Sequence, residues 1–287
     1  MKYVFGALKK IRIARPVCAA AAAALLLSGI LTSARESAIF TPKDGRPVLI
    51  VAHRGVSKFA PQNTIPATEK AIKMGLDFVE IDVRTTKDGR LVLMHNESVD
   101  GTTDGKGLIK DLTLEEIKKL DAGYKFRQKF KGTRVPTIEE YYAAANGRIN
   151  TYLDWKDATP EALADAIIKA GAIETTLIYG GSEELRAIRK IDPRFMVMTE
   201  CDSELILRSV ESSKLKLDAM ASNVESFNPE VAALAHKLGM KTFIDIQTSA
   251  DNCSGVKKQI SIGADAVQTD NPDMVLKCLA PKKPEVQ

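Results

Sequence analysis

The sequence predicts an α/β protein, a TIM-type (β/α)8 barrel that occupies residues 48–280 as one domain. Short apolar runs alternate with helical patterns along the chain, which indicates parallel strands joined by helices. The number of these units suits a closed barrel, and 287 residues are enough to form one. An open, doubly wound sheet is the alternative, but no glycine-rich dinucleotide fingerprint follows the first strand.

Nine segments have the composition of strands, one more than the barrel needs. They are Val48–Ala52, Phe78–Val83, Leu91–Met94, Ile149–Trp155, Thr175–Tyr179, Phe195–Met198, Ala219–Ser222, Lys241–Ile246 and Ala266–Thr269. The helical patterns between them include Ile65–Met74, Pro160–Ala170, Ser182–Ile191, Asp202–Glu211 and Pro229–Leu238. Asp88-Gly89 separates the second and third segments and favours a two-residue hairpin turn. We therefore expect a β-hairpin extension of the second barrel strand, with Asp82 opposite His95.

Residues 96–146 form the longest stretch without a clear strand. We interpret them as a small insertion at the C-terminal mouth of the barrel, where loops form active sites. A short helix is expected over Thr113–Leu120, because Thr113 and Glu116 have capping-box spacing. Basic residues surround Phe126 and Phe130 here, and we favour a solvated segment over a membrane-binding loop.

Residues 1–34 have the pattern of an export signal peptide, with five basic residues and no acidic one. The uncharged segment Val17–Ser33 follows and is rich in alanine and leucine. An uncleaved membrane anchor is the alternative, although the apolar run has the minimum length for a membrane span. We expect an exported protein, periplasmic or secreted, with membrane contact only through this segment or the insertion.

The charge balance does not indicate a nucleic-acid partner. The formal charge of +4 falls to −1 when the five basic residues of the leader are removed. Three cysteines follow the leader, at Cys201, Cys253 and Cys278, and their spacing matches no disulfide framework or metal site. We expect buried, unpaired thiols, while one disulfide would be compatible with an oxidising compartment.

The residues that suggest chemistry stand at strand ends. His53 and His95 end two predicted strands, and Glu80-Ile81-Asp82 between them places two carboxylates on one face of a strand. A solvent-facing polar edge is the alternative, but the flanking residues are apolar. Two acids facing a barrel interior repel each other unless a cation lies between them, and a hard divalent ion suits oxygen ligands.

A second polar group ends the fourth strand segment. Asp154 and Lys156 lie on one face there, adding a third acid and a cation, although a simple ion pair explains them equally well. Arg54 directly follows His53, and Gly55 allows the backbone to turn closely. A guanidinium beside a metal cluster suggests a phosphate ligand, whose oxygens it can bind bidentately.

Further motifs accompany these residues in a fixed order. The whole set is His53-Arg54-Gly55, Pro61-Gln62-Asn63-Thr64, Glu80-Ile81-Asp82-Val83, Asp88-Gly89, His95-Asn96, Thr102-Thr103-x-Gly105-x-Gly107, Leu120-Asp121-Ala122-Gly123, Val135-Pro136-Thr137-Ile138-Glu139-Glu140, Gly263-Ala264-Asp265 and Thr269-Asp270-x-Pro272. In order and spacing it strongly resembles the signature of the glycerophosphodiester phosphodiesterase family, over residues 48 to about 275.

The resemblance implies metal-dependent hydrolysis of a small glycerophosphodiester to an alcohol and glycerol phosphate. One histidine would deprotonate the attacking water or glycerol 2-hydroxyl, and the other would protonate the leaving alkoxide. The implied roles are His53 and His95 as catalytic acid and base, Glu80, Asp82 and Asp154 as ligands of one Mg²⁺ or Ca²⁺ ion, and Arg54 and Lys156 as phosphate contacts.

The chain departs from the family pattern at a few positions. Gln62 and Asp154 stand where glutamate is usual, Gly101 where arginine is common, and Phe243-Ile244-Asp245 where many members carry tryptophan or asparagine. We expect these differences to reshape the pocket for the alcohol rather than the reaction centre. Two alternatives are a phospholipase D-like enzyme acting on lipid or sugar phosphodiesters and a non-catalytic binding barrel, which the intact histidines and acids disfavour.

Overall fold

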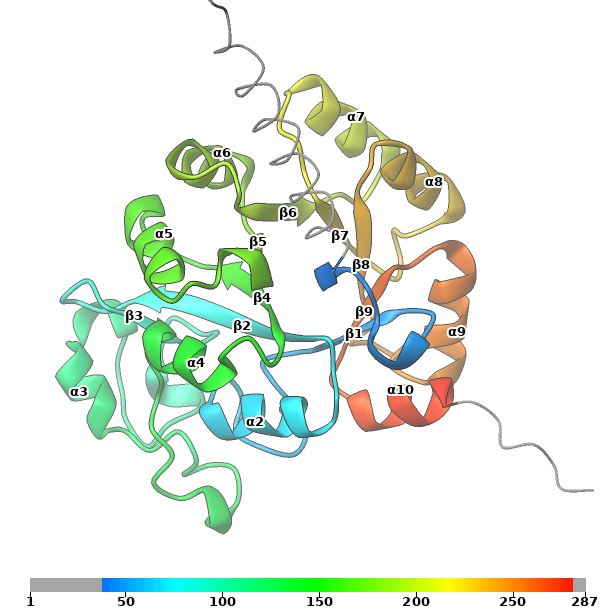
Figure 1. The fold of residues 1–287 in the computed structure, drawn as a ribbon. Coiled ribbons are helices and arrows are strands. Elements are labelled where there is room, and N and C mark those ends of the chain that lie inside the picture. Colours follow the sequence, from blue (N-terminus) through cyan, green and yellow to red (C-terminus); the bar gives the residue numbers. More distant parts are fainter. Residues whose placement is uncertain (1–37, 281–287) are drawn as a thin grey trace, which may run out of the picture. The chain divides into compact units, whose positions relative to one another are not determined.

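The computed structural model describes residues 38–280, and the residues from Ile39 onward belong to one compact unit. Eight parallel strands follow one another around a barrel, and pairing of the first with the second closes it, as Figure 1 shows. The strands are β1 (Leu49–Ala52), β2 (Phe78–Thr85), β4 (Asn150–Trp155), β5 (Thr176–Tyr179), β6 (Met196–Glu200), β7 (Ala219–Asn223), β8 (Lys241–Asp245) and β9 (Ala266–Thr269). The predicted TIM-type barrel is confirmed.

A helix follows each barrel strand and covers its outer face (Figure 1). The helices are α2 (Ile65–Lys73), α4 (Ile138–Ala145), α5 (Pro160–Lys169), α6 (Ser182–Ile191), α7 (Glu204–Ser212), α8 (Pro229–Lys237), α9 (Cys253–Ile262) and α10 (Pro272–Leu279). Several begin with a proline, which fits the first helical turn because its missing N–H has no partner there. None of the helices within residues 38–280 has the length and apolar character needed to cross a bilayer.

The strands are buried on both faces, and side-chain alternation divides the core into two layers. Leu49 and Val51 of β1 pack inside the barrel, whereas Ile50 and Ala52 pack against the helices. Phe78 of β2 and its interior neighbours likewise fill the barrel. Because alternation continues to the end of each strand, the last interior-facing residues of each strand point into the mouth of the barrel.

The hairpin exists, but its register differs from the predicted one. β3 (Leu91–Leu93) pairs antiparallel with β2, and the Thr86 N–H donates to the Arg90 carbonyl at 2.9 Å. The loop therefore has three residues, of which only Gly89 has a positive φ, whereas a two-residue type I′ turn needs two such residues. The predicted pairing of Asp82 with His95 is wrong by one residue, since the Asp82 carbonyl accepts from the Met94 N–H.

The insertion is shorter than expected. It contains the predicted capped helix, now α3 (Leu114–Lys119), whose capping box between Thr113 and Glu116 is formed. The expected insertion extended to Asn146, but α4 is the barrel helix between β2 and β4 and packs beside α2. A second capping box, between Thr137 and Glu140, forms at the start of this helix. Its Thr-x-x-Glu spacing is the sequence pattern from which the start of α4 could have been predicted.

Two of the three cysteines form a disulfide. Cys253 at the start of α9 is bonded to Cys278 near the end of α10, while Cys201 is buried and unpaired. The expectation of unpaired thiols is therefore wrong for two residues. Closure of the barrel makes α9 and α10 neighbours, and the spacing of the cysteines in the sequence does not reveal that these helices are adjacent.

We expect the double variant Cys253→Ser, Cys278→Ser to lose about 3 kcal/mol of unfolding free energy, because the bond closes a long loop in the unfolded chain. Denaturant unfolding under oxidising conditions measures this loss. A reductant should destabilise the wild type to a similar extent and leave the double variant unchanged. Equal stability of the oxidised wild type and the variant would contradict the expectation.

Candidate active site

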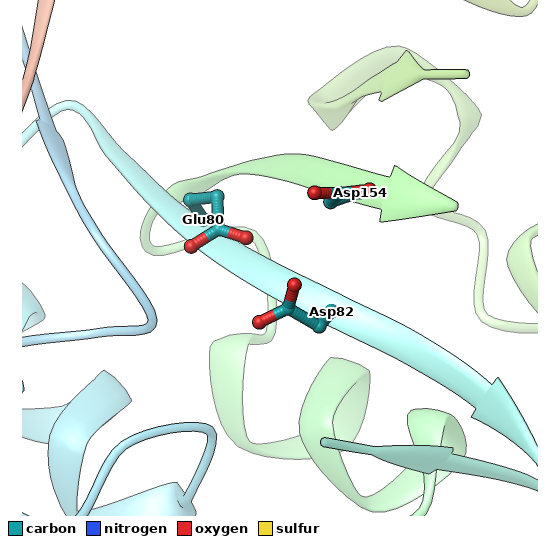
Figure 2. A group of neighbouring side chains, drawn as sticks. All are labelled: Glu80, Asp82 and Asp154. Carbon is teal, nitrogen blue, oxygen red and sulfur yellow. The ribbon is translucent and has the colours of Figure 1, made fainter. Parts of the chain in front are cut away.

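Three acidic side chains meet at the mouth of the barrel. Glu80 and Asp82 share the interior face of β2 with Phe78, and Asp154 shares that of β4 with Tyr152. Asp82 and Asp154 are direct partners in the register of β2 and β4. Figure 2 shows the three carboxylates gathered over these two neighbouring strands. Each can offer an oxygen within 4.8 Å of the others, so the three acids proposed from the sequence as metal ligands do lie together.

The three acids have fewer positively charged neighbours than they need to balance their negative charge. Burial, with the neighbouring acids Asp82 and Asp154, raises the pKa of Glu80 well above its usual value. Burial also raises the pKa of Asp154, partly offset by Lys156. Lys156 Nζ lies 2.6 Å from Asp154 Oδ2 and 3.2 Å from Asp82 Oδ1, and Arg54 Nε lies 3.6 Å from Asp82 Oδ2. Three carboxylates thus share two cationic side chains.

The donor set fits a hard divalent cation. All three ligands are carboxylates, which Mg²⁺ and Ca²⁺ prefer. Asp82 is fully buried, and the contact of its Oδ1 with Lys156 Nζ, at 3.2 Å, does not have hydrogen-bond geometry within residues 38–280. A buried carboxylate oxygen is stabilised further if a second cation contacts it. Glu80, Asp82 and Asp154 could therefore hold such an ion.

The turn after β1 depends on glycine. Arg54 and Gly55 both have positive φ angles, of 51° and 79°. A Cβ at Gly55 would lie 2.6 Å from the Ala67 Cβ, so this position has no room for another residue. The turn directs the Arg54 N–H to Glu80 Oε2 at 2.6 Å, and Arg54 Nη1 donates to Gln62 Oε1 at 2.9 Å. The expected close turn beside His53 is present.

Asn63 is a site residue to which the sequence interpretation gave no role. It adopts a left-handed conformation, and its Nδ2 donates to Asp82 Oδ2 at 2.7 Å. Its Oδ1 accepts from the Asp82 N–H at 3.1 Å. This two-point contact fixes the Asp82 carboxylate. The signal was available, because Asn63 belongs to one of the motifs that carry the family resemblance.

The two histidines approach the acids from different strands. His53 follows β1, and its Nδ1 lies 2.8 Å from Oδ1 of Asp270, which follows β9. This hydrogen bond lowers the pKa of Asp270, so the carboxylate is ionised and can hold the proton of His53 on Nδ1. His95 follows β3, and its Nδ1 lies 2.8 Å from Asn96 Oδ1. Asp270 also lacked a role in the sequence interpretation, although its motif is part of the resemblance.

Comparisons with known proteins identify the family of this chain. The family model described as Glycerophosphoryl diester phosphodiesterase family matches residues 53–274. A glycerophosphodiester phosphodiesterase of Caldanaerobacter subterraneus subsp. tengcongensis is 35% identical over 240 residues, covering 79% of this chain and 96% of the relative.

Solved structures share the fold. A glycerophosphodiester phosphodiesterase from Agrobacterium tumefaciens superposes with a TM-score of 0.70 at 27% identity, covering 79% of this chain and 98% of its own. An Oleispira antarctica phosphodiesterase, solved with the product sn-glycerol-3-phosphate, has a TM-score of 0.72 at 24% identity, covering 81% and 97%. With its family match over most of the sequence, this chain belongs to the glycerophosphoryl diester phosphodiesterase family.

Proposed function

We propose that this protein hydrolyses glycerophosphodiesters, releasing an alcohol and glycerol phosphate. One observation supports this most directly: the acids Glu80, Asp82 and Asp154 lie at one barrel mouth together with His53 and His95. The family membership of the chain gives the same activity. Charge stabilisation and proton transfer, the two requirements of phosphodiester cleavage, both have side chains in this place.

The positively charged side chains beside the acids would bind the phosphate. Glu80, Asp82 and Asp154 would hold one divalent ion, Mg²⁺ or Ca²⁺, which when bound withdraws charge from the phosphate oxygens. Arg54 and Lys156 both contact these acids, so their positive charge lies where the phosphate would bind. A guanidinium and an ammonium donate several hydrogen bonds to such oxygens.

Proton transfer is the task of the two histidines. Asp270 holds His53 through Nδ1, which leaves Nε2 to accept or deliver a proton. The contact between His95 and Asn96 likewise occupies Nδ1. One histidine deprotonates the attacking hydroxyl and the other protonates the leaving alkoxide. We propose Asp270 as the positioning residue for His53.

Export is the second part of the proposal. Residues 1–34, which carry the basic leader and the uncharged segment, lie outside the described residues. The Cys253–Cys278 disulfide adds independent support, because disulfides persist in oxidising compartments and are rare in the cytosol. A periplasmic or secreted location therefore fits best, with an uncleaved N-terminal anchor as the alternative.

Removal of a metal ligand should weaken cation binding. Glu80→Gln, Asp82→Asn and Asp154→Asn should each weaken Mg²⁺ or Ca²⁺ binding at least about tenfold, because each removes a charged oxygen ligand. Isothermal titration calorimetry measures this, with Glu183→Gln on the exposed start of α6 as the control. Chelation should abolish hydrolysis of glycerophosphocholine, and added Mg²⁺ or Ca²⁺ should restore it. Full activity after thorough chelation would show that the reaction does not need a metal ion bound by these three residues.

Loss of either histidine should impair the reaction. We expect His53→Ala and His95→Ala each to lower kcat at least about a hundredfold, the usual size of general acid–base catalysis. His236→Ala is the matched control, because this third histidine of the chain lies on α8 and pairs with Asp265, which directly precedes β9. Circular dichroism should show that all three variants are folded. Near-normal turnover of either site variant would make that histidine structural.

The mature protein should begin near Arg35. The basic leader and the uncharged run predict cleavage there, and N-terminal sequencing of the native protein measures it. An intact Met1 in a soluble cytoplasmic fraction would refute export. An intact leader in the membrane fraction would instead favour the anchor.

A further inference from the structure

The turn after β9 carries Asp270, and a carboxylate from another loop holds this turn. Asp251, in the loop between β8 and α9, contacts three consecutive residues of the turn. Its Oδ1 accepts from Thr269 Oγ1 at 2.5 Å, and its Oδ2 accepts from the Asp270 N–H at 3.0 Å and from Asn271 Nδ2 at 2.9 Å. Asp251 therefore fixes the backbone from which the Asp270 side chain reaches His53 Nδ1.

Asn271 contributes to this contact instead of capping its own helix. It is the N-cap residue of α10, but among the described residues its side chain accepts no hydrogen bond from the backbone of that helix. Asn228 and Asn252, the N-cap residues of α8 and α9, do accept one. Asn271 Nδ2 donates to Asp251, and its Oδ1 accepts from Lys58 Nζ at 3.0 Å. The side chain that would stabilise the start of α10 thus connects the turn to the loop before α9.

The Cys253–Cys278 disulfide ties the same loop to the same helix. Cys253 is the first residue of α9, two positions after Asp251, and Cys278 is the penultimate residue of α10. The two helices contact each other, as Figure 1 shows. Asp251 contacts the residues at the start of α10 and Cys253 is bonded near its end, so the segment 251–253 holds this helix at two points.

The loop has little room to move independently of Cys253. It folds back on the first turn of α9, where a Cβ at Gly255 would lie 2.0 Å from the Ala250 carbonyl oxygen. Asn252 Oδ1 also accepts from the Gly255 N–H at 3.1 Å. A displacement of Cys253 should therefore displace Asp251 as well.

We propose that Asp251 is a positioning residue that acts through Asp270 on His53, and that the Cys253–Cys278 disulfide holds Asp251 in place. The inference rests on the proposed function, in which this histidine transfers a proton. A shift of Asp270 would change the direction in which His53 Nε2 points, and a displacement of about 1 Å can slow catalysis strongly. The candidate metal ligands lie on β2 and β4 rather than on β8 or β9, so substrate binding should change less than turnover.

The first test measures kcat and KM for glycerophosphocholine in the oxidised protein with added Mg²⁺ and Ca²⁺. Asp251→Asn should lower kcat about tenfold and change KM less than about twofold, because an NH₂ group replaces one of the two oxygens that accept from the turn. Glu230→Gln at the exposed start of α8 is the matched control and should change neither constant. An unchanged kcat in folded Asp251→Asn would overturn the proposal.

The Asp270→Asn variant decides how Asp251 acts. If Asp251 acts through Asp270, Asp251→Asn should have little further effect on kcat in the Asp270→Asn background. An equal fall in both backgrounds would overturn the proposal, because Asp251 would then act independently of Asp270. Asn271→Ala removes one contact of the turn and should lower kcat about threefold, which keeps the test decisive if Asp251→Asn does not fold. An unchanged kcat in that variant would then overturn the proposal.

Reduction tests the role of the disulfide. Dithiothreitol transfers two electrons and two protons to the bond, which becomes two thiols while the reductant becomes a cyclic disulfide. In protein that circular dichroism shows to be folded, reduction should lower kcat about threefold. The double variant Cys253→Ser, Cys278→Ser should have the lower kcat already and should not respond to the reductant. Equal turnover of the oxidised and reduced wild type would overturn the role proposed for the bond.

A proton resonance reports on the same contact without activity. The His53 Nδ1 proton donated to Asp270 should give a downfield signal, identified by its loss in His53→Ala. This signal should shift in Asp251→Asn and in the reduced protein, but not in Glu230→Gln. A signal unchanged by Asp251→Asn would overturn the inference whether or not the wild type is active. A wild type that cleaves no glycerophosphodiester would instead overturn the proposed function.

Discussion

The main physical constraint on this structure is the repulsion between three carboxylates that lie close together in a largely apolar barrel. Pairing of β2 with β4 sets Asp82 opposite Asp154, and alternation puts Glu80 on the same face. Like charges removed from water are tolerated only if cations compensate for the lost hydration and the repulsion. Lys156 and Arg54 supply part of that compensation, and a divalent ion would supply the rest. The left-handed turn after β1 brings a backbone N–H to this cluster as well.

The mouth of the barrel separates charge into two halves. Positive side chains lie beside the acids of β2 and β4, while Glu200 and Asp245 on β6 and β8 have no cationic partner among the described residues. Such a field orients a charged substrate before contact. The acids of β2 and β4 and the carboxylates of β6 and β8 lie on different strands, so substitutions can change one set without changing the other.

Features that arise from alternation within one segment could be predicted from the sequence. Glu80 and Asp82 share a face for that reason, and each strand segment could be recognised separately. The hairpin register could not be predicted from Asp88-Gly89, because this pair suits loops of two or three residues. Here the Asp88 carboxylate accepts from the Leu114 N–H of the distant helix α3, a contact that no local pattern reveals. The disulfide was missed for the same reason, since it requires α9 and α10 to be neighbours.

The contact between His53 and Asp270 depends on the whole barrel. The acid cluster forms on β2 and β4, whereas His53 ends the first strand and Asp270 follows the last, 217 residues away. They meet when β1 pairs with β9, and the pairing of β1 with β2, which closes the sheet, places the turn after His53 beside the acid cluster. Ordering so long a segment costs chain entropy before the contact can compensate for it. The orientation of this histidine is thus a property of the closed barrel, while the candidate metal site is a property of one pair of strands.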